Sequence, residues 1–174
     1  MNFFIVEIKA RYEDHVWLQS HLEDRGARLI GKDRQEDIFF NVSSGRLKWR
    51  TGQVEDSLIH YHRQDQKQPK VSEGQLIRVN ADSDLKDMLV NSLGVKVRVV
   101  KERIVYFVDN VKVHLDEVEG LGKFVEIEAI DSDGTLGKEF LNNQCDELKK
   151  AFRIEEENLI DRSYSDLILE QKEN

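Results

Sequence analysis

The sequence predicts an α+β fold, in which an eight-stranded antiparallel sheet closes, or nearly closes, into a β-barrel with helices packed outside. Eight segments alternate apolar and polar residues at the period of a strand, whereas only three or four have the spacing of a helix. Many strands with few helices are typical of an antiparallel sheet closed on itself. A further observation, charge on the polar face of several strands, indicates what the barrel would enclose.

The expected strands run from the N-terminus well into the second half of the chain. They cover residues 2–11, 37–42, 45–51, 57–64, 71–79, 96–109, 111–118 and 122–130. Asp109 and Asn110 separate two alternating runs and predict a tight hairpin turn. The single proline, Pro69, lies in the most polar stretch, which we expect to be an exposed hairpin loop.

Helical spacing appears between and after these strands. We expect helices over residues 13–25, 83–93 and 135–152, and a shorter one over 161–170. The lone cysteine, Cys145, falls in the third helix and is expected to be a small buried hydrophobic residue. A single cysteine excludes an internal disulfide and suits a reducing cytoplasm.

Composition limits the classes of function. The 174 residues suit one domain spanning 1–174. No apolar run is long enough to cross a bilayer, so we expect a cytoplasmic protein without a membrane partner. The net charge of −8, from 26 basic and 34 acidic residues, argues against a nucleic-acid partner. The oligomeric state, monomer or homodimer, stays open.

The first expected strand carries charge on one face. Its even-numbered residues are apolar, whereas its odd-numbered residues end in Glu7, Lys9 and Arg11. Other strands repeat this pattern. Their charged faces carry Lys48, Arg50, Arg63, Lys101, Arg103, Lys112, His114, Asp116, Glu126 and Glu128.

One strand of this kind is usually the solvated face of an ordinary sheet. Several together favour apolar faces turned outward under helices and charged faces turned into the barrel. Buried like charges need counter-ions, so the interior should be wet and should bind a ligand. Its cations outnumber its carboxylates, so a polyanion such as a triphosphate would balance it. The carboxylates would hold Mg²⁺ or Mn²⁺, which take oxygen ligands.

Seven segments follow one another in an order that resembles a known family. They are VEIKAR (6–11), GRLKWR (45–50), LIHYHR (58–63), KER (101–103), VHLD (113–116), GLGKFVEIE (120–128) and RSYSDL (162–167). The series is similar to the CYTH superfamily, the triphosphate-tunnel metalloenzymes, and most similar to its class IV adenylyl cyclase branch. The resemblance covers nearly the whole chain.

The resemblance implies an enzyme that converts ATP to cyclic AMP and pyrophosphate, or a triphosphatase acting on thiamine triphosphate or inorganic tripolyphosphate. It implies Mg²⁺ or Mn²⁺ as cofactor, held by Glu7, Glu126 and Glu128. The residues it implies for the triphosphate are Lys9, Arg11, Lys48, Arg50, Arg63, Lys101, Arg103 and Arg162. Those it implies for catalysis are Lys9, Lys101, Arg103 and Asp116.

One position departs from the family pattern. The family opens with Glu-x-Glu-x-Lys, but Ile5 stands at the first glutamate, so that only Glu7 and Lys9 match. One metal-site carboxylate is therefore missing, which leaves a non-catalytic polyphosphate-binding or nucleotide-binding module as the alternative.

Three further interpretations concern single residues. His60 and His62 are taken as ordinary strand histidines, because a zinc site needs three or four close ligands. Trp49 shares a face with Leu47, which favours core packing over stacking on a base. Replacing Arg50 or Arg103 with lysine is expected to raise the stability of the ligand-free protein slightly, because crowded like charges would be relieved.

Overall fold

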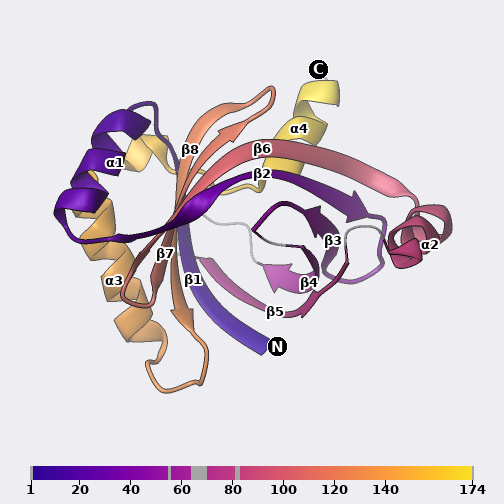
Figure 1. The fold of residues 1–174 in the computed structure, drawn as a ribbon, viewed down its shortest axis with the longest axis horizontal. Helices are drawn as coiled ribbons and strands as arrows, with labels where there is room; N and C mark the ends of the chain where they lie inside the picture. Colours follow the sequence, from indigo (N-terminus) through magenta and orange to yellow (C-terminus); the bar gives the residue numbers. More distant parts are fainter. Residues whose placement is uncertain (1, 55, 64–69, 81–82, 174) are drawn as a thin grey trace.

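The computed structural model describes residues 2–54, 56–63, 70–80 and 83–173 (Figure 1). The strands are β1 (Asn2–Arg11), β2 (Arg28–Phe40), β3 (Arg46–Thr51), β4 (Ser57–Arg63), β5 (Lys70–Arg78), β6 (Val95–Val108), β7 (Val111–Val118) and β8 (Gly122–Asp131). The helices are α1 (His15–Asp24), α2 (Asp84–Leu93), α3 (Lys138–Ala151), the short 3₁₀ helix η1 (Glu156–Asn158) and α4 (Tyr164–Glu173).

The strands form one antiparallel sheet in the order β1-β5-β4-β3-β2-β6-β7-β8. Strand β1 pairs with β5 on one side and with β8 on the other, so the hydrogen-bonded ladder continues around a closed ring (Figure 1). The predicted α+β class with eight antiparallel strands is confirmed. None of the described helices is long and apolar enough to span a membrane.

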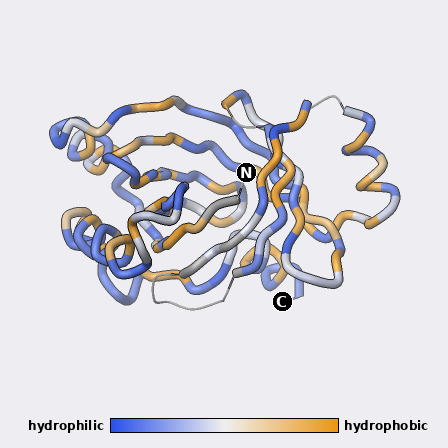
Figure 2. The backbone as a smooth tube through the Cα atoms, turned by 90° about the horizontal axis from the view of Figure 1, so that it is seen from below, coloured by the Kyte–Doolittle hydropathy of each residue, from blue (hydrophilic) through white to orange (hydrophobic). Residues whose placement is uncertain are grey.

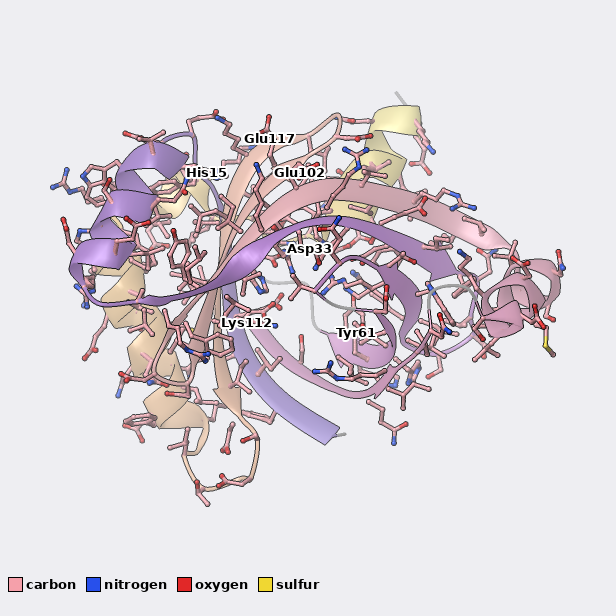
Figure 3. The ribbon with its side chains drawn as sticks, viewed as in Figure 1. His15, Asp33, Tyr61, Glu102, Lys112 and Glu117 are labelled. Atoms are coloured by element: carbon pink, nitrogen blue, oxygen red, sulfur yellow. The ribbon has the colours of Figure 1, made fainter. Side chains whose placement is uncertain are left out.

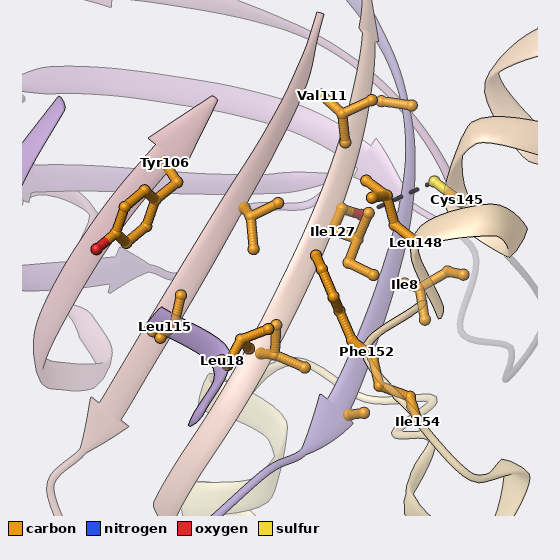
Figure 4. Close-up of a cluster of buried hydrophobic side chains, with 14 of the residues drawn as sticks. Ile8, Leu18, Tyr106, Val111, Leu115, Ile127, Cys145, Leu148, Phe152 and Ile154 are labelled. Atoms are coloured by element: carbon orange, nitrogen blue, oxygen red, sulfur yellow. Dashed lines mark hydrogen bonds between the residues drawn. The ribbon is translucent and has the colours of Figure 1, made fainter. Parts of the chain in front are cut away.

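The largest apolar cluster lies outside the sheet, between strands β1, β7 and β8 and helices α1 and α3 (Figure 4). Ile8 and Ile127 project from the strands and pack with Leu148 and Phe152 of the α3 region. Figure 2 shows that hydropathy changes along the strands, and because successive side chains point to opposite faces, the apolar residues share the outward face. Cys145 is fully buried in this cluster, which confirms its predicted role, and its Sγ lies 3.4 Å from the Val6 carbonyl oxygen.

A second outward cluster lies under α2. Trp49 is fully buried with Ile38 and Phe40, and the helix contributes Leu89 and Leu93. The packing role predicted for Trp49 is therefore confirmed.

Helix α4 packs on a different surface from the other helices. Leu167 and Ile168 lie against Phe39, Val97 and Val99. Phe39 and Val99 also line the interior cavity, so α4 covers side chains that point into the barrel. Ser163 caps the helix through a reciprocal pair of hydrogen bonds with Asp166.

The strand boundaries match the predictions within about two residues, apart from the start of β2. This strand begins at Arg28, well before the predicted residue 37, and pairs with the long β6 over most of its length. Its first part is mostly exposed, and its apolar residues, Leu29 and Ile30, are adjacent, so no apolar alternation marks it in the sequence. The turn at Asp109–Asn110 is confirmed, with Asp109 at a φ of 53°. The predicted loop at Pro69 lies outside the described residues.

Candidate functional site

The barrel encloses a cavity of about 290 Å³ whose wall is rich in charge. Figure 3 shows Tyr61 and Lys112 inside the ring of strands, and Glu102 and Glu117 on its outside. The charged residues of the cavity wall are Glu7, Lys9, Asp37, Lys48, Arg50, Lys101, Arg103, Lys112, Glu126 and Glu128. The predicted arrangement, with apolar faces outward and charged faces inward, is therefore confirmed for these strands.

One part of the wall, which we call the cationic pole, consists of Asp37, Lys48, Arg50 and Lys101. The Arg50 guanidinium donates two hydrogen bonds to Asp37, of 2.7 Å from Nε and 2.8 Å from a terminal nitrogen. The ammonium groups of Lys48 and Lys101 lie 3.3 and 3.1 Å from Oδ2 of the same carboxylate. Strands β2, β3 and β6 thus place three cations around one buried carboxylate.

Burial and charge shift the pKa values in the cationic pole. Burial alone would raise the pKa of Asp37, but Arg50, Lys101 and Lys48 hold it well below its usual range. Burial, followed by the Arg103 charge, lowers the pKa of Lys101 to about 7, although the Asp37 charge acts in the opposite direction. The pKa of Lys48 is lowered for the same reasons, burial first and then Arg50.

The second part, the acidic pole, consists of Glu7, Lys9, Arg103, His114, Asp116, Glu126 and Glu128. Arg103 donates two hydrogen bonds of 2.6 Å to Asp116 and one of 2.7 Å to Glu126. The Lys9 ammonium lies 2.8 Å from the other oxygen of Glu126. Burial would raise the pKa of Glu126, but Lys9 and Arg103 hold it well below its usual range.

Helix α4 contributes Tyr164 to the acidic pole. Its hydroxyl donates a 2.8 Å hydrogen bond to Asp116, and the Lys9 ammonium lies 3.7 Å from the centre of its ring. Burial raises the pKa of Tyr164 well above its usual range, and the Asp116 and Glu126 charges raise it further. Asp116 therefore fixes both Arg103 and Tyr164, although it is not itself among the residues that line the cavity.

Three side chains of the acidic pole could hold a metal ion. Ligand atoms of His114, Glu126 and Glu128 all lie within 4.8 Å of one another. Glu7 lies directly opposite Glu128 in the β1–β8 register, and Lys112 lies opposite Glu128 in the β7–β8 register, so two like charges meet beside one cation. Carboxylate oxygens are the donors that Mg²⁺ and Mn²⁺ take, so the residues present fit such an ion.

The structure brings together most of the predicted site residues. Of the predicted triphosphate ligands, five line the cavity, namely Lys9, Lys48, Arg50, Lys101 and Arg103. The three predicted metal ligands, Glu7, Glu126 and Glu128, also line it.

Two predicted ligands lie elsewhere. Arg11, at the end of β1, is exposed, and its guanidinium donates a 3.0 Å hydrogen bond to the Leu121 carbonyl oxygen. Arg162 is exposed, forms an ion pair with Glu170, and is not among the residues that line the cavity. The predicted placement of Arg11 inside the barrel is wrong, whereas the role of Arg162 as a phosphate ligand stays a prediction. The side chain of Arg63 lies outside the described residues.

Sequence reasoning missed Asp37, the shared partner of three cations. The sequence does contain the information to place Asp37. Asp37 and Phe39 alternate with the outward residues Ile38 and Phe40, which predicts that Asp37 points into the barrel. Sequence reasoning placed His114 on the charged face of its strand without giving it a role, and the structure confirms that His114 lines the cavity. Ile5 does line the cavity, as its place in the family signature implied.

Comparisons with known proteins agree with this architecture. A Methanocaldococcus jannaschii protein described as "Putative adenylate cyclase MJ0240" is 28% identical over 177 residues, which cover 93% of this chain and 97% of that protein. The PH1012 protein from Pyrococcus horikoshii OT3 has the same fold, with a TM-score of 0.79 and 23% identity over 94% of this chain and 98% of that chain.

A Vibrio parahaemolyticus structure, described as a "putative adenylate cyclase", also shares the fold. Its TM-score is 0.76 and its identity 19%, over 95% of this chain and 98% of that one. A sequence model of the CYTH domain matches residues 5–164, nearly the whole chain. The chain therefore belongs to the CYTH domain family, to which its ordered motifs had pointed.

Proposed function

We propose that this protein is a metal-dependent enzyme that binds the triphosphate of ATP in the barrel cavity and converts ATP to cyclic AMP and pyrophosphate. The observation that carries the proposal is the cationic pole, in which Lys48, Arg50 and Lys101 converge on Asp37 inside a cavity that also holds an acidic pole. Family membership and the adenylate cyclase names of two relatives support it.

The cationic pole suits phosphate because of its donors. A planar guanidinium such as that of Arg50 can bind two phosphate oxygens at once, whereas ammonium groups act as compact point charges. Asp37 supplies a single negative charge to three cations in the free protein. A triphosphate carries several negative charges and would compete with Asp37 for the same donors.

The acidic pole would hold Mg²⁺ or Mn²⁺ through Glu7, Glu126 and Glu128. Such an ion polarises phosphate oxygens and neutralises charge that develops during phosphoryl transfer. Lys9 and Arg103 also line the cavity, where ion pairs with Glu126 and Asp116 hold them. Both would contact the same phosphates. Both are fixed by buried ion pairs, so little reorganisation would be needed as charge develops.

In the proposed cyclase reaction the ribose 3′-oxygen attacks the α-phosphorus. The new bond closes the cyclic phosphodiester, the bond from the α-phosphorus to the bridging oxygen breaks, and pyrophosphate leaves. A triphosphatase would instead direct water at the γ-phosphorus of the same bound group. The protein's part in either reaction is to position the phosphates and stabilise charge.

A non-catalytic polyphosphate-binding module is a second candidate, and Ile5 is the observation that favours it. Ile5 lines the cavity two residues from Glu7, so an apolar side chain occupies the wall where the family signature has a carboxylate. Such a module would be stabilised by a triphosphate but would release no product. Ile5→Glu would add an oxygen ligand there, and a gain in Mn²⁺ affinity in that variant would support this placement.

A product assay separates the candidates. The protein is incubated with ATP, thiamine triphosphate or inorganic tripolyphosphate, each with Mg²⁺ and with Mn²⁺. We expect cyclic AMP and pyrophosphate from ATP, and neither without added metal. Release of orthophosphate from the other two substrates would replace the cyclase proposal with a triphosphatase. If a triphosphate stabilised the protein but no product formed, the protein would be assigned as a non-catalytic polyphosphate-binding module.

A further inference from the structure

His114 stands out among the histidines of the chain because it lies inside the barrel. It projects from β7 into the cavity wall, and only 2% of it is exposed. Its register neighbour on β8 is Glu126, and Glu128 lies two residues further along the same face. The ring is therefore fixed among the carboxylates of the acidic pole.

The ring makes close polar approaches to both carboxylates. Its Nδ1 lies 3.3 Å from Oε2 of Glu126 and 3.6 Å from an oxygen of Glu128. Its other nitrogen, Nε2, is buried and has no hydrogen-bond partner among the residues that the structure describes. Nδ1 is therefore the nitrogen that faces the two carboxylates.

The same three side chains form a compact set of donors. Their ligand atoms lie within 4.8 Å of one another, close enough to surround one ion. Two of the donors are oxygens and one is an imidazole nitrogen. Lys9 and Arg103 already neutralise much of the charge on Glu126, so a hard ion that depends on carboxylate charge gains less here.

We propose that His114 supplies an imidazole nitrogen to the divalent ion bound by Glu126 and Glu128, and so makes the site prefer Mn²⁺ to Mg²⁺. The inference deepens the proposed function and rests on its metal site. Imidazole suits transition-metal ions, whereas Mg²⁺ takes oxygen ligands almost exclusively. His114 also adds a donor to a site in which Ile5 provides none.

Pulsed electron paramagnetic resonance of bound Mn²⁺ tests the inference, because it detects a coordinated nitrogen independently of turnover. The protein is loaded with one equivalent of Mn²⁺ as wild type, as His114→Asn and as His62→Asn. Asparagine places an oxygen near the position of Nδ1. His62 is an exposed histidine on β4 and is the matched control. Mg²⁺ competition on the same samples measures the selectivity.

We expect nitrogen coupling in the wild type and in His62→Asn, and its loss in His114→Asn. The preference for Mn²⁺ over Mg²⁺ should fall about tenfold in His114→Asn alone. Bound Mn²⁺ without nitrogen coupling in the wild type would overturn the inference and leave the carboxylate site of the proposed function intact. A wild type that binds no Mn²⁺ would overturn both.

A second sample keeps the test decisive if His114→Asn does not fold. Wild-type protein made with ¹⁵N-labelled histidine should show the coupling pattern of ¹⁵N in place of that of ¹⁴N. Coupling that stays ¹⁴N in this sample would assign the nitrogen to another residue type and overturn the inference.

Discussion

The two poles of the cavity hold charge in opposite proportions. In the cationic pole three basic side chains share Asp37, whereas in the acidic pole Lys9, Arg103 and Lys112, which lies opposite Glu128, face four carboxylates, namely Glu7, Asp116, Glu126 and Glu128. Neither pole is balanced by its own residues. The difference indicates two kinds of partner, an anion at one pole and a cation at the other.

The elements that build the poles differ as well. The cationic pole comes from β2, β3 and β6, and the acidic pole from β1, β7 and β8, with Arg103 of β6 between them. The three strands of the acidic pole are those whose outer faces pack beneath α1 and α3. The strands of the acidic pole are therefore supported from outside by the largest apolar cluster, which helps to keep the acidic side chains in place.

The largest effect should follow from removing the carboxylate that the cationic pole shares. Asp37→Asn keeps size and takes away the charge that Lys48, Arg50 and Lys101 surround. Breaking a buried ion cluster in this way should lower the free energy of unfolding by about 3–5 kcal/mol. Inorganic tripolyphosphate should then raise the melting temperature of the variant more than that of the wild type, because the anion replaces the lost charge.

Asp33→Asn is the control for this experiment. Asp33 is a buried residue of the same strand, but its carboxylate accepts hydrogen bonds from the Gln35 side chain and the Gln53 amide. This variant should lose stability without any added response to tripolyphosphate. Equal responses in the two variants would contradict the assignment of the anion to the cationic pole.

The next largest effect should come from the acidic pole. Glu126→Gln removes the charge that Lys9 and Arg103 contact and one oxygen of the proposed metal site. We expect kcat to fall at least about 10²-fold, comparable to losing one strong electrostatic contribution. Pyrophosphate release measures the change, and Glu117→Gln, at an exposed position of β7, is the control. Full activity in Glu126→Gln would remove this residue from the metal site.

The sequence predicted the fold well wherever a strand had one apolar face. Strands β1, β7 and β8 alternate clearly because helices cover their outer faces, and their limits differ from the predicted ones by at most one residue. The first part of β2 could not be found in this way. Its apolar residues, Leu29 and Ile30, are adjacent and exposed, and its inward residues, Asp33 and Gln35, are polar, so no apolar alternation marks the part that pairs with β6.

The candidate site was predictable to the extent that it follows from alternation. Face assignment placed Lys48, Arg50, Lys101 and Arg103 together, and it failed for Arg11 only because β1 extends past the cavity. The alternation of apolar and polar residues predicts which face of the sheet a side chain is on, but not how far it lies from side chains on other strands. Charge was therefore expected to be crowded, whereas the structure pairs each of these four inward cations with a buried carboxylate.

This pairing reverses one expectation. Arg50→Lys was expected to stabilise the ligand-free protein slightly, but Arg50 makes two short hydrogen bonds to Asp37 that lysine cannot reproduce. We now expect the free energy of unfolding to fall by about 1.5–3 kcal/mol. Arg103→Lys at the acidic pole should cost more, because Arg103 contacts both Asp116 and Glu126. Chemical denaturation without ligand compares the two, and a more stable Arg50→Lys would restore the crowding interpretation.

The smallest effect should appear in the pH dependence of stability at the cationic pole. Burial, followed by Arg103, lowers the pKa of Lys101 to about 7 in the folded protein, below its ordinary value of 10.5. Between pH 7 and pH 10.5 the unfolded chain binds more protons at Lys101 than the folded protein does, so the free energy of unfolding rises with pH in this range. The stability gained through Lys101 is complete above the ordinary pKa and is lost as the pH falls through about 7. From pH 7 to pH 8 the free energy of unfolding should therefore rise by about 1 kcal/mol through Lys101.

The variant Lys101→Met should remove that part of the pH dependence. Lys96→Met, on the exposed face of the same strand, is the control for the loss of a charge. If the free energy of unfolding had the same pH dependence in the wild type and in Lys101→Met, the Lys101 ammonium would stay charged in the folded protein. Asp37 would then be surrounded by three full positive charges at neutral pH.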